Sequence, residues 1–310
     1  MGAIGLGLAA LGRPEYINIR ENKNIDKSQE SFESNSYAVL DAAYKHGVRF
    51  FDTAPSYGKG EMFLQKWDKD RNHLDAILST KWGYTYVANW ELGYKGSHEI
   101  KEHSLEKLIE QWEQSESLLP RLKFYQIHSA TIESGVLDNT EVLGKLFEFK
   151  SKFNLQIGLT SSGVNQRKVI LKGLGIEKNG IQLFDSYQVT YNVFEQNLFE
   201  LLFELKEQGK FIIIKEALAN GRVFLKSESN ELLKTLAEKY NVGVDAISLR
   251  YCLDSIPSDI VLSGAANENQ LKSNMRALDF ELTHEEKYLL KSLKVSPEEY
   301  WNERSLLEWD

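Results

Sequence analysis

Eight short apolar runs alternate with longer amphipathic segments along the chain, and this alternation constrains the fold more than any other feature of the sequence. The runs are mostly apolar, as parallel strands covered on both faces are. They span residues 3–7, 48–52, 76–81, 124–128, 156–160, 186–189, 211–215 and 260–263. Eight strands, each followed by a helix, predict an α/β fold whose parallel strands close into a (β/α)8 TIM barrel.

The main alternative is an open doubly wound sheet. Such a sheet usually carries a Gly-x-Gly-x-x-Gly turn that leads straight from the first strand into a helix. Here Gly5, Gly7 and Gly12 match that pattern only in part, and a polar stretch over residues 13–29 precedes any helical pattern. No linker or short repeat interrupts the alternation, so we expect a single barrel domain over residues 1–310.

Composition argues against several classes of function. The net charge of −8 is unfavourable for a nucleic-acid surface, because binding phosphates requires clustered Lys and Arg. The single cysteine, Cys252, leaves no internal disulfide, and the six histidines lack metal-ligand spacing, so we expect no metal. No apolar run approaches the ~20 residues of a membrane span, and no secretory signal pattern opens the chain. We therefore expect a cytoplasmic protein, monomeric by default, with no nucleic-acid or membrane partner.

Four polar residues follow the apolar runs where the strands should end. Asp52 ends the second run, Lys81 the third and His128 the fourth, and Tyr57 lies five residues beyond Asp52. Because active sites of such barrels lie at the carboxyl ends of the strands, these four side chains should converge above one rim.

The four residue types form a chemically coherent group. A free tyrosine has a pKa near ~10 and transfers protons poorly at neutral pH. A buried ammonium beside Tyr57 should lower that pKa, and Lys81 can supply it if Asp52 keeps the lysine charged. His128 can then donate a hydrogen bond to a substrate oxygen or share in proton transfer. The sequence thus predicts a site for proton transfer to or from a substrate oxygen.

The stretch over residues 47–58, Gly-Val-Arg-Phe-Phe-Asp-Thr-Ala-Pro-Ser-Tyr-Gly, closely resembles the signature of the aldo-keto reductase family. Lys81 and His128 stand where the other catalytic residues of that family stand. The resemblance implies this barrel, with a small carbonyl or alcohol compound as substrate and NADPH, less often NADH, as cofactor. It makes Tyr57 the general acid, tuned by Lys81 and Asp52, with His128 orienting the carbonyl.

The resemblance also implies where the cofactor binds. The positions that hold the nicotinamide carboxamide are Thr160, Ser161 and Gln188. The loop over the pyrophosphate carries Leu218, Asn220, Gly221 and Arg222, and the guanidinium of Arg222 is expected to pair with phosphate charge. The adenosine end is implied at Ser263, Gly264, Gln270 and Asn274.

Three departures from the family pattern bear on the cofactor and the fold. Lys215 stands where an aromatic residue commonly stacks on the nicotinamide. Glu268 lies near the position where Arg or Lys usually receives the 2′-phosphate of NADPH, which leaves the cofactor preference open. The short hairpin that plugs the barrel floor in many members is missing, so another segment should cover the floor.

The substrate pocket is expected in the loops above the strand ends, with Trp82 and Tyr84 among its walls. Aromatic walls suit a sugar face or an apolar carbonyl equally well. Three functions therefore stay open: a reductase of aldehydes, ketones or sugars, an NAD-linked sugar or alcohol dehydrogenase working oxidatively, and a non-catalytic cofactor-binding regulatory subunit.

Overall fold

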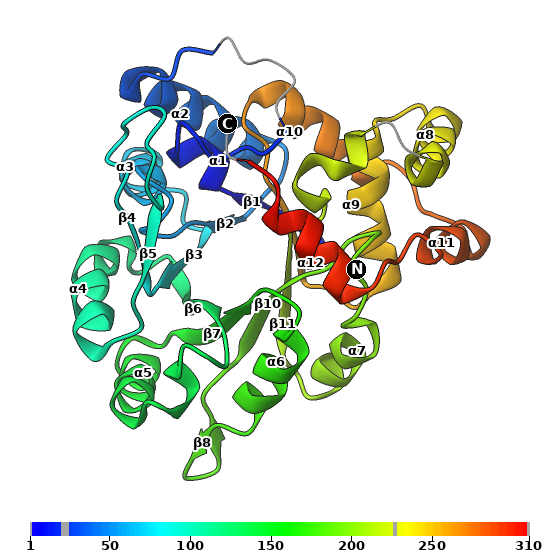
Figure 1. The fold of residues 1–310 in the computed structure, drawn as a ribbon. Helices are drawn as coiled ribbons and strands as arrows, with labels where there is room; N and C mark the ends of the chain where they lie inside the picture. Colours follow the sequence, from blue (N-terminus) through cyan, green and yellow to red (C-terminus); the bar gives the residue numbers. More distant parts are fainter. Residues whose placement is uncertain (1, 20–24, 226–227, 309–310) are drawn as a thin grey trace.

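In a computed structural model, which describes residues 2–19, 25–225 and 228–308, the eight expected runs form one closed barrel of parallel strands. The strand order is β1-β12-β11-β10-β7-β6-β3-β2, which confirms the predicted fold class. Figure 1 shows the ring of strands with the helices packed around its outside. The barrel strands are β1 (Ala3–Gly7), β2 (Phe50–Asp52), β3 (Ile77–Trp82), β6 (Leu122–Ala130), β7 (Gln156–Ser161), β10 (Ser186–Thr190), β11 (Phe211–Lys215) and β12 (Ile260–Ser263).

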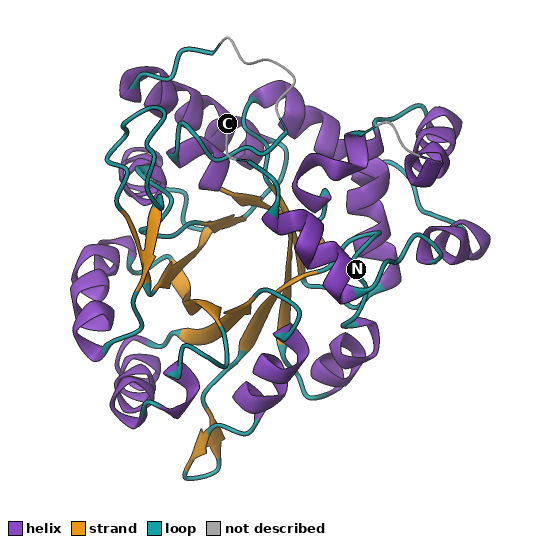
Figure 2. Ribbon diagram, viewed as in Figure 1, coloured by secondary structure: helices purple, strands orange, loops and turns teal. Residues whose placement is uncertain are grey.

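The outer layer of helices follows from amphipathic sequence and polar caps (Figure 2). In α4 the Ser104 hydroxyl accepts the backbone N–H of Lys107, while Leu108 and Trp112 are buried against the barrel. The helices are α1 (Ala9–Gly12), α2 (Gln29–Lys45), α3 (Gly60–Arg71), α4 (Leu105–Ser115), α5 (Thr140–Phe153), α6 (Gln166–Leu174), α7 (Phe199–Glu207), α8 (Glu228–Tyr240), α9 (Val244–Ser255), α10 (Glu268–Met275), α11 (His284–Lys291) and α12 (Pro297–Ser305).

The floor of the barrel is filled by phenylalanine side chains from the amino ends of the strands. The rings of Phe50, Phe124 and Phe211 lie 4.8–6.2 Å apart between centroids. Ile213 and Ile260 join them in an apolar cluster separate from the larger core under the helices. Side chains of the strands thus fill the floor, where the sequence led us to expect cover by another segment.

Two additions lie at the opposite, carboxyl end of the strands. An antiparallel hairpin of β4 (Tyr84–Tyr86) and β5 (Glu99–Lys101) is formed by the aromatic segment after β3. Helix α12, red in Figure 1, lies beside the barrel rim and contacts the loops after β10 and β11.

A further small hairpin, formed by β8 (Glu177–Lys178) and β9 (Ile181–Gln182), precedes β10. Across the described ranges, no helix combines the length and the apolar character that crossing a membrane requires.

Candidate active site

A buried ion pair lies at the carboxyl ends of two adjacent strands, β2 and β3. The side chains of Asp52 and Lys81 are 2% and 1% exposed and contact each other directly. The Lys81 ammonium also donates to the Thr53 carbonyl at 3.0 Å. A charged pair is tolerated at such depth only when further hydrogen bonds satisfy its remaining groups.

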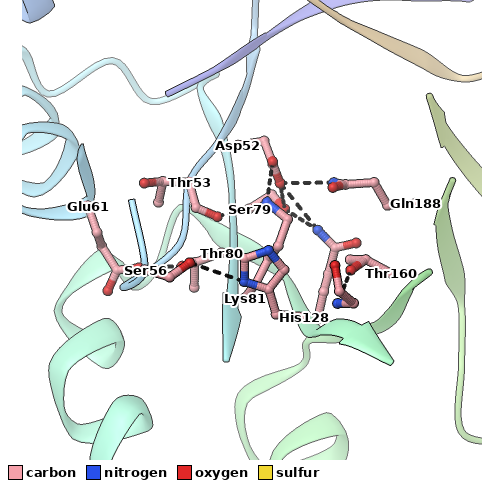
Figure 3. Close-up of polar contacts among 12 residues, drawn as sticks. Asp52, Thr53, Ser56, Glu61, Ser79, Thr80, Lys81, His128, Thr160 and Gln188 are labelled. Atoms are coloured by element: carbon pink, nitrogen blue, oxygen red, sulfur yellow. Dashed lines mark hydrogen bonds and ion pairs between the residues drawn. The ribbon is translucent and has the colours of Figure 1, made fainter. Parts of the chain in front are cut away.

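Neighbouring strands supply those bonds to one oxygen of Asp52, as Figure 3 shows. The Ser79 hydroxyl donates to Asp52 Oδ1 at 2.8 Å, and the amides of Gln126 and Gln188 donate to it at 3.3 and 3.2 Å. The donors come from β3, β6 and β10, so three strands besides β2 hold the carboxylate in one orientation.

Tyr57 lies above this pair. Its ring centroid is 4.8 Å from the Lys81 ammonium and 5.6 Å from the His128 ring, which meets it edge-on at 87°. Burial raises the pKa of Tyr57 well above its ordinary value, and the charges of Asp52 and Glu99 raise it further. The pKa of Tyr57 is therefore raised in this structure, where the sequence led us to expect it lowered. Tyr57 is a neutral phenol that keeps its proton at neutral pH.

A close approach between the end of α1 and the loop after β2 fixes the backbone of Tyr57. Lys59 donates its N–H to the Gly12 carbonyl at 2.8 Å, and a Cβ on Gly12 would lie only 2.1 Å from the Tyr57 carbonyl oxygen. Gly58, with φ +60°, meets Gly12 from the other side. Gly12 thus leaves the space that the loop carrying Tyr57 occupies.

His128 is held through its backbone. His103 Nε2 donates to the His128 carbonyl at 2.9 Å, and the N–H of Ser129 donates to the Thr160 hydroxyl at 2.6 Å. Burial lowers the pKa of His128 well below its ordinary value, and the ammonium groups of Lys81 and Lys215 lower it further. The imidazole is therefore neutral, with one protonated ring nitrogen.

Gly83 leaves the space that His103 occupies behind His128. Its φ is +105°, and an added Cβ would lie 2.0 Å from His103 Cδ2. We expect Gly83→Ala to displace His103 and to lower the free energy of unfolding by about 3 kcal/mol, combining backbone strain with the clash. Urea unfolding measures this.

The matched control for this substitution is Gly180→Ala on the β8–β9 turn. Its φ is +75°, but no atom lies within 4 Å of the added Cβ, so only the strain of about 1 kcal/mol applies. Equal losses for both variants would show that the packing against His103 is unimportant.

The residues expected to hold the nicotinamide lie on β7 and β10, which follow β6 on the far side of it from the ion pair. Thr160, Ser161 and Gln188 are buried on β7 and β10. The Ser161 hydroxyl is a buried group without a hydrogen-bond partner in the described part of the chain. Lys215, at the end of β11, donates to the hydroxyls of Ser162 at 2.9 Å and Thr190 at 2.8 Å. This set of hydroxyl and amide groups fits an amide-bearing ring, because such a ring both donates and accepts hydrogen bonds.

In the loop after β11, the buried side chain of Arg222 contacts α12. Arg222 is buried in the 3-10 helix η3 (Ala219–Phe224) and donates to the Tyr300 carbonyl at 3.2 Å and to Glu303 at 3.0 Å. Its guanidinium also stacks on the Tyr300 ring at 4.1 Å. This side chain thus contacts α12, while its Nη2 has no hydrogen-bond partner within the described residues, and the expected pairing with cofactor phosphate stays a prediction.

The backbone of the same loop is unusual. Ala219, Asn220 and Gly221 all have positive φ, as does Glu216 just before them. Left-handed conformations at residues other than glycine are strained and concentrate at functional sites. Leu218, Asn220 and Gly221 thus lie in a strained turn above the barrel, where the sequence places the pyrophosphate loop.

The expected adenosine end surrounds the start of α10. Ser263 and Asn274 are buried and hydrogen-bonded to each other at 2.8 Å. Gln270 accepts the backbone N–H of Ala266 at 2.8 Å. Gly264 is exposed, with open space where a Cβ would be, and the Glu268 side chain points to solvent. Gly264 and Glu268 thus give this end an exposed face that a ligand can approach.

The two residues expected in the substrate pocket differ in position. Tyr84 is half-buried with its ring 4.7 Å from that of His128, and burial raises its pKa to about 12. Trp82 is fully buried and packs edge-on against His103 at 5.4 Å. Trp82 therefore supports the site from behind and has no surface to offer a substrate.

The structure brings further charged groups to the site that sequence reasoning missed. Glu99 on β5 pairs with the buried Arg13 at 2.8 Å, and Arg304 on α12 lies 3.4 Å from Glu216. Glu99 and Glu216 both act on the pKa of Tyr57. In the sequence, only Ser56, which directly precedes Tyr57, indicated that further polar side chains lie at the site. Within residues 2–19, 25–225 and 228–308, no cluster of three or more metal-ligating side chains occurs.

The chain is similar to known proteins in sequence. A family model described as the Aldo/keto reductase family matches residues 3–294. The aldo-keto reductase ausK of Aspergillus calidoustus is 26% identical, the match covering 82% of this chain and 72% of that protein.

Solved structures share the fold. The aldo-keto reductase AKR11C1 from Bacillus halodurans, in its holo form, superposes with a TM-score of 0.69 at 23% identity, over 94% of this chain and 92% of that one. The glycerol dehydrogenase AKR11B4 from Gluconobacter oxydans gives a TM-score of 0.72 at 19% identity, over 94% and 90%.

Proposed function

Because the chain belongs to the aldo/keto reductase family, we propose that it is an NAD(P)-dependent oxidoreductase that moves a hydride between nicotinamide and an aldehyde, ketone or sugar. The observation that carries this proposal is the stacking of Tyr57 above the buried Asp52–Lys81 pair, with His128 against its ring edge. Such an arrangement suits proton transfer to an oxygen atom that gains negative charge.

Each of these residues has a distinct role in the proposed reaction. The nicotinamide, when bound, supplies or accepts the hydride at the substrate carbon. Tyr57 gives its phenolic proton to the substrate oxygen, and the Lys81 ammonium stabilises the phenolate that remains. Asp52 keeps Lys81 charged and in place, and neutral His128 orients the substrate oxygen by a hydrogen bond. Thr160, Ser161 and Gln188 hold the carboxamide, with Lys215 at the ring.

The test is titration of the purified protein with NADH and with NADPH, followed by quenching of tryptophan fluorescence, and then turnover on a panel of aldehydes, ketones and sugars. Binding together with turnover supports the proposal. Binding of neither cofactor contradicts it. Binding without turnover on any substrate, together with a partner protein captured in equal amount, supports the regulatory subunit instead.

A second candidate, an NAD-linked dehydrogenase of sugars or alcohols, rests on Glu268. Its exposed carboxylate at the start of α10 repels a 2′-phosphate and can accept a hydrogen bond from a ribose hydroxyl. We expect NADH to bind at least about tenfold more tightly than NADPH, and Glu268→Lys to raise the affinity for NADPH about tenfold.

The control for that substitution is Glu285→Lys, which makes the same charge change at an exposed position on α11. It should leave both dissociation constants unchanged. Tighter binding of NADPH than NADH by the unmodified protein would remove the basis of the second candidate and favour the reductase.

A further inference from the structure

The side chain of Lys215 reaches from its own strand to the ends of two others. Lys215 ends β11 and is paired in register with Thr190, which ends β10. Its ammonium donates to the Thr190 hydroxyl at 2.8 Å and to the hydroxyl of Ser162, the residue after β7, at 2.9 Å. The strands β7, β10 and β11 are successive neighbours in the barrel. The ammonium therefore lies at the carboxyl ends of β10 and β7.

The same two strands carry the residues proposed to hold the nicotinamide carboxamide. Ser162 directly follows Ser161, and Thr190 lies two positions after Gln188. The Ser161 hydroxyl is buried and has no hydrogen-bond partner among the described residues, so it is available to a ligand. Because a carboxamide is bonded directly to its ring, a nicotinamide held by these strands lies beside the Lys215 ammonium. This placement rests on the proposed function.

No carboxylate of the described residues forms an ion pair with Lys215. The nearby carboxylates have other cations as partners: Asp52 pairs with Lys81, and Glu216 lies 3.4 Å from Arg304. The two hydroxyls that bind the Lys215 ammonium accept hydrogen bonds but bring no negative charge. Lys215 therefore adds a positive charge at the place proposed for the ring.

The charge of Lys215 depends on its surroundings. The ordinary pKa of a lysine lies about three units above neutral. Burial lowers the pKa of Lys215, whereas the charge of Glu216 raises it. The hydroxyls of Ser162 and Thr190 also favour the charged form, because they accept its hydrogen bonds. We therefore expect Lys215 to be an ammonium at neutral pH.

The two redox forms of a nicotinamide differ in charge. The oxidised ring is positive and the reduced ring is neutral, so an ammonium held beside the ring repels only the oxidised form. We propose that Lys215 weakens the binding of the oxidised cofactor relative to the reduced cofactor, through its ammonium at the ends of β7 and β10. Lys215 is thus a residue that selects between the two redox forms.

This selection affects the balance between bound reactants. An alcohol and an oxidised nicotinamide give a carbonyl, a reduced nicotinamide and one proton, and the protein does not change the equilibrium constant of this reaction in solution. Preferential binding of the reduced form therefore shifts the equilibrium between bound species toward the reduced cofactor and the carbonyl. The charge of Lys215 favours alcohol oxidation on the protein, the direction of the second candidate function.

The test compares the dissociation constants of the oxidised and reduced cofactor in the unmodified protein and in Lys215→Met. Isothermal titration calorimetry measures them without an optical signal, using whichever of NAD(H) and NADP(H) binds more tightly. Methionine keeps an unbranched side chain but carries no charge. The ratio of the oxidised to the reduced dissociation constant should fall about tenfold in this variant. A purely structural role of Lys215 changes both constants together, so an unchanged ratio overturns the proposal.

Two further variants separate the charge at this position from other effects. Lys215→Arg keeps the charge, because a guanidinium does not lose its proton in proteins, and should keep most of the ratio. Lys210→Met removes an ammonium just before β11, where Lys210 is 6% exposed and donates to the Phe184 carbonyl at 2.8 Å. Five residues of strand separate it from Lys215, about 16 Å, so the ratio should not change. An equal fall in Lys210→Met and Lys215→Met contradicts the proposal.

The same titrations distinguish this inference from the function on which it rests. If both redox forms bind but Lys215→Met leaves their ratio unchanged, only the role of Lys215 is wrong. If neither form binds to the unmodified protein, the proposed function fails and the role of Lys215 fails with it.

Discussion

Replacing Tyr57 by phenylalanine is expected to reduce hydride transfer roughly 10²–10⁴-fold, the usual contribution of a positioned acid or base. The variant keeps the ring that packs 5.6 Å from His128 and loses only the hydroxyl, so the fold and cofactor binding should be retained. The rate is measured from the absorbance of the reduced nicotinamide as it is consumed or formed. Cofactor binding is measured by fluorescence titration.

The comparison variant for Tyr57→Phe is Tyr288→Phe, which removes a hydroxyl from a tyrosine 76% exposed on α11. Its rate should equal that of the unmodified protein. If Tyr57→Phe retains full hydride transfer to every carbonyl tested, Tyr57 is not the proton donor, and the mechanism proposed above is wrong.

Lys81→Met is expected to cost about 3–5 kcal/mol of unfolding free energy, because it leaves the Asp52 carboxylate buried without its partner. Ser79, Gln126 and Gln188 still donate to that carboxylate, but neutral donors do not balance its charge. Adding Asp52→Asn should recover part of the loss, since the double variant buries no net charge. Urea unfolding of the single and double variants measures both effects.

An exposed ion pair provides the reference for this experiment. Lys66 and Glu33 lie 2.7 Å apart with side chains 47% and 32% exposed. Lys66→Met should cost no more than about 1 kcal/mol, because solvent replaces the lost interaction. Similar losses at Lys66 and Lys81 would mean that burial adds nothing to the Asp52–Lys81 pair.

The barrel and the positions of the four central residues could be predicted because both depend on local pattern. Short apolar runs give parallel strands, and a polar residue at the end of such a run lies at the carboxyl rim. Asp52, Lys81 and His128 each follow this rule, and their register on adjacent strands brings them together.

What could not be predicted depends on contacts between distant residues. The contacts of Arg222 with Tyr300 and Glu303 join residues 78 and 81 positions apart in the chain, and no local pattern indicates them. The pKa of Tyr57 reflects burial, which is a property of the folded packing and not of neighbouring residue types. The ion pair of Glu99 with Arg13 depends on where the β4–β5 hairpin places residue 99.

The division of the site along the chain affects how the protein can change over evolutionary time. Asp52, Tyr57, Lys81 and His128 all belong to β2, β3, β6 and the loop after β2, whereas the proposed cofactor residues follow on β7, β10, β11 and β12. The two groups meet where the Gln188 amide reaches Asp52. In the proposed mechanism, substitutions in the second half can therefore change which nicotinamide cofactor binds without altering the residues proposed to move the proton.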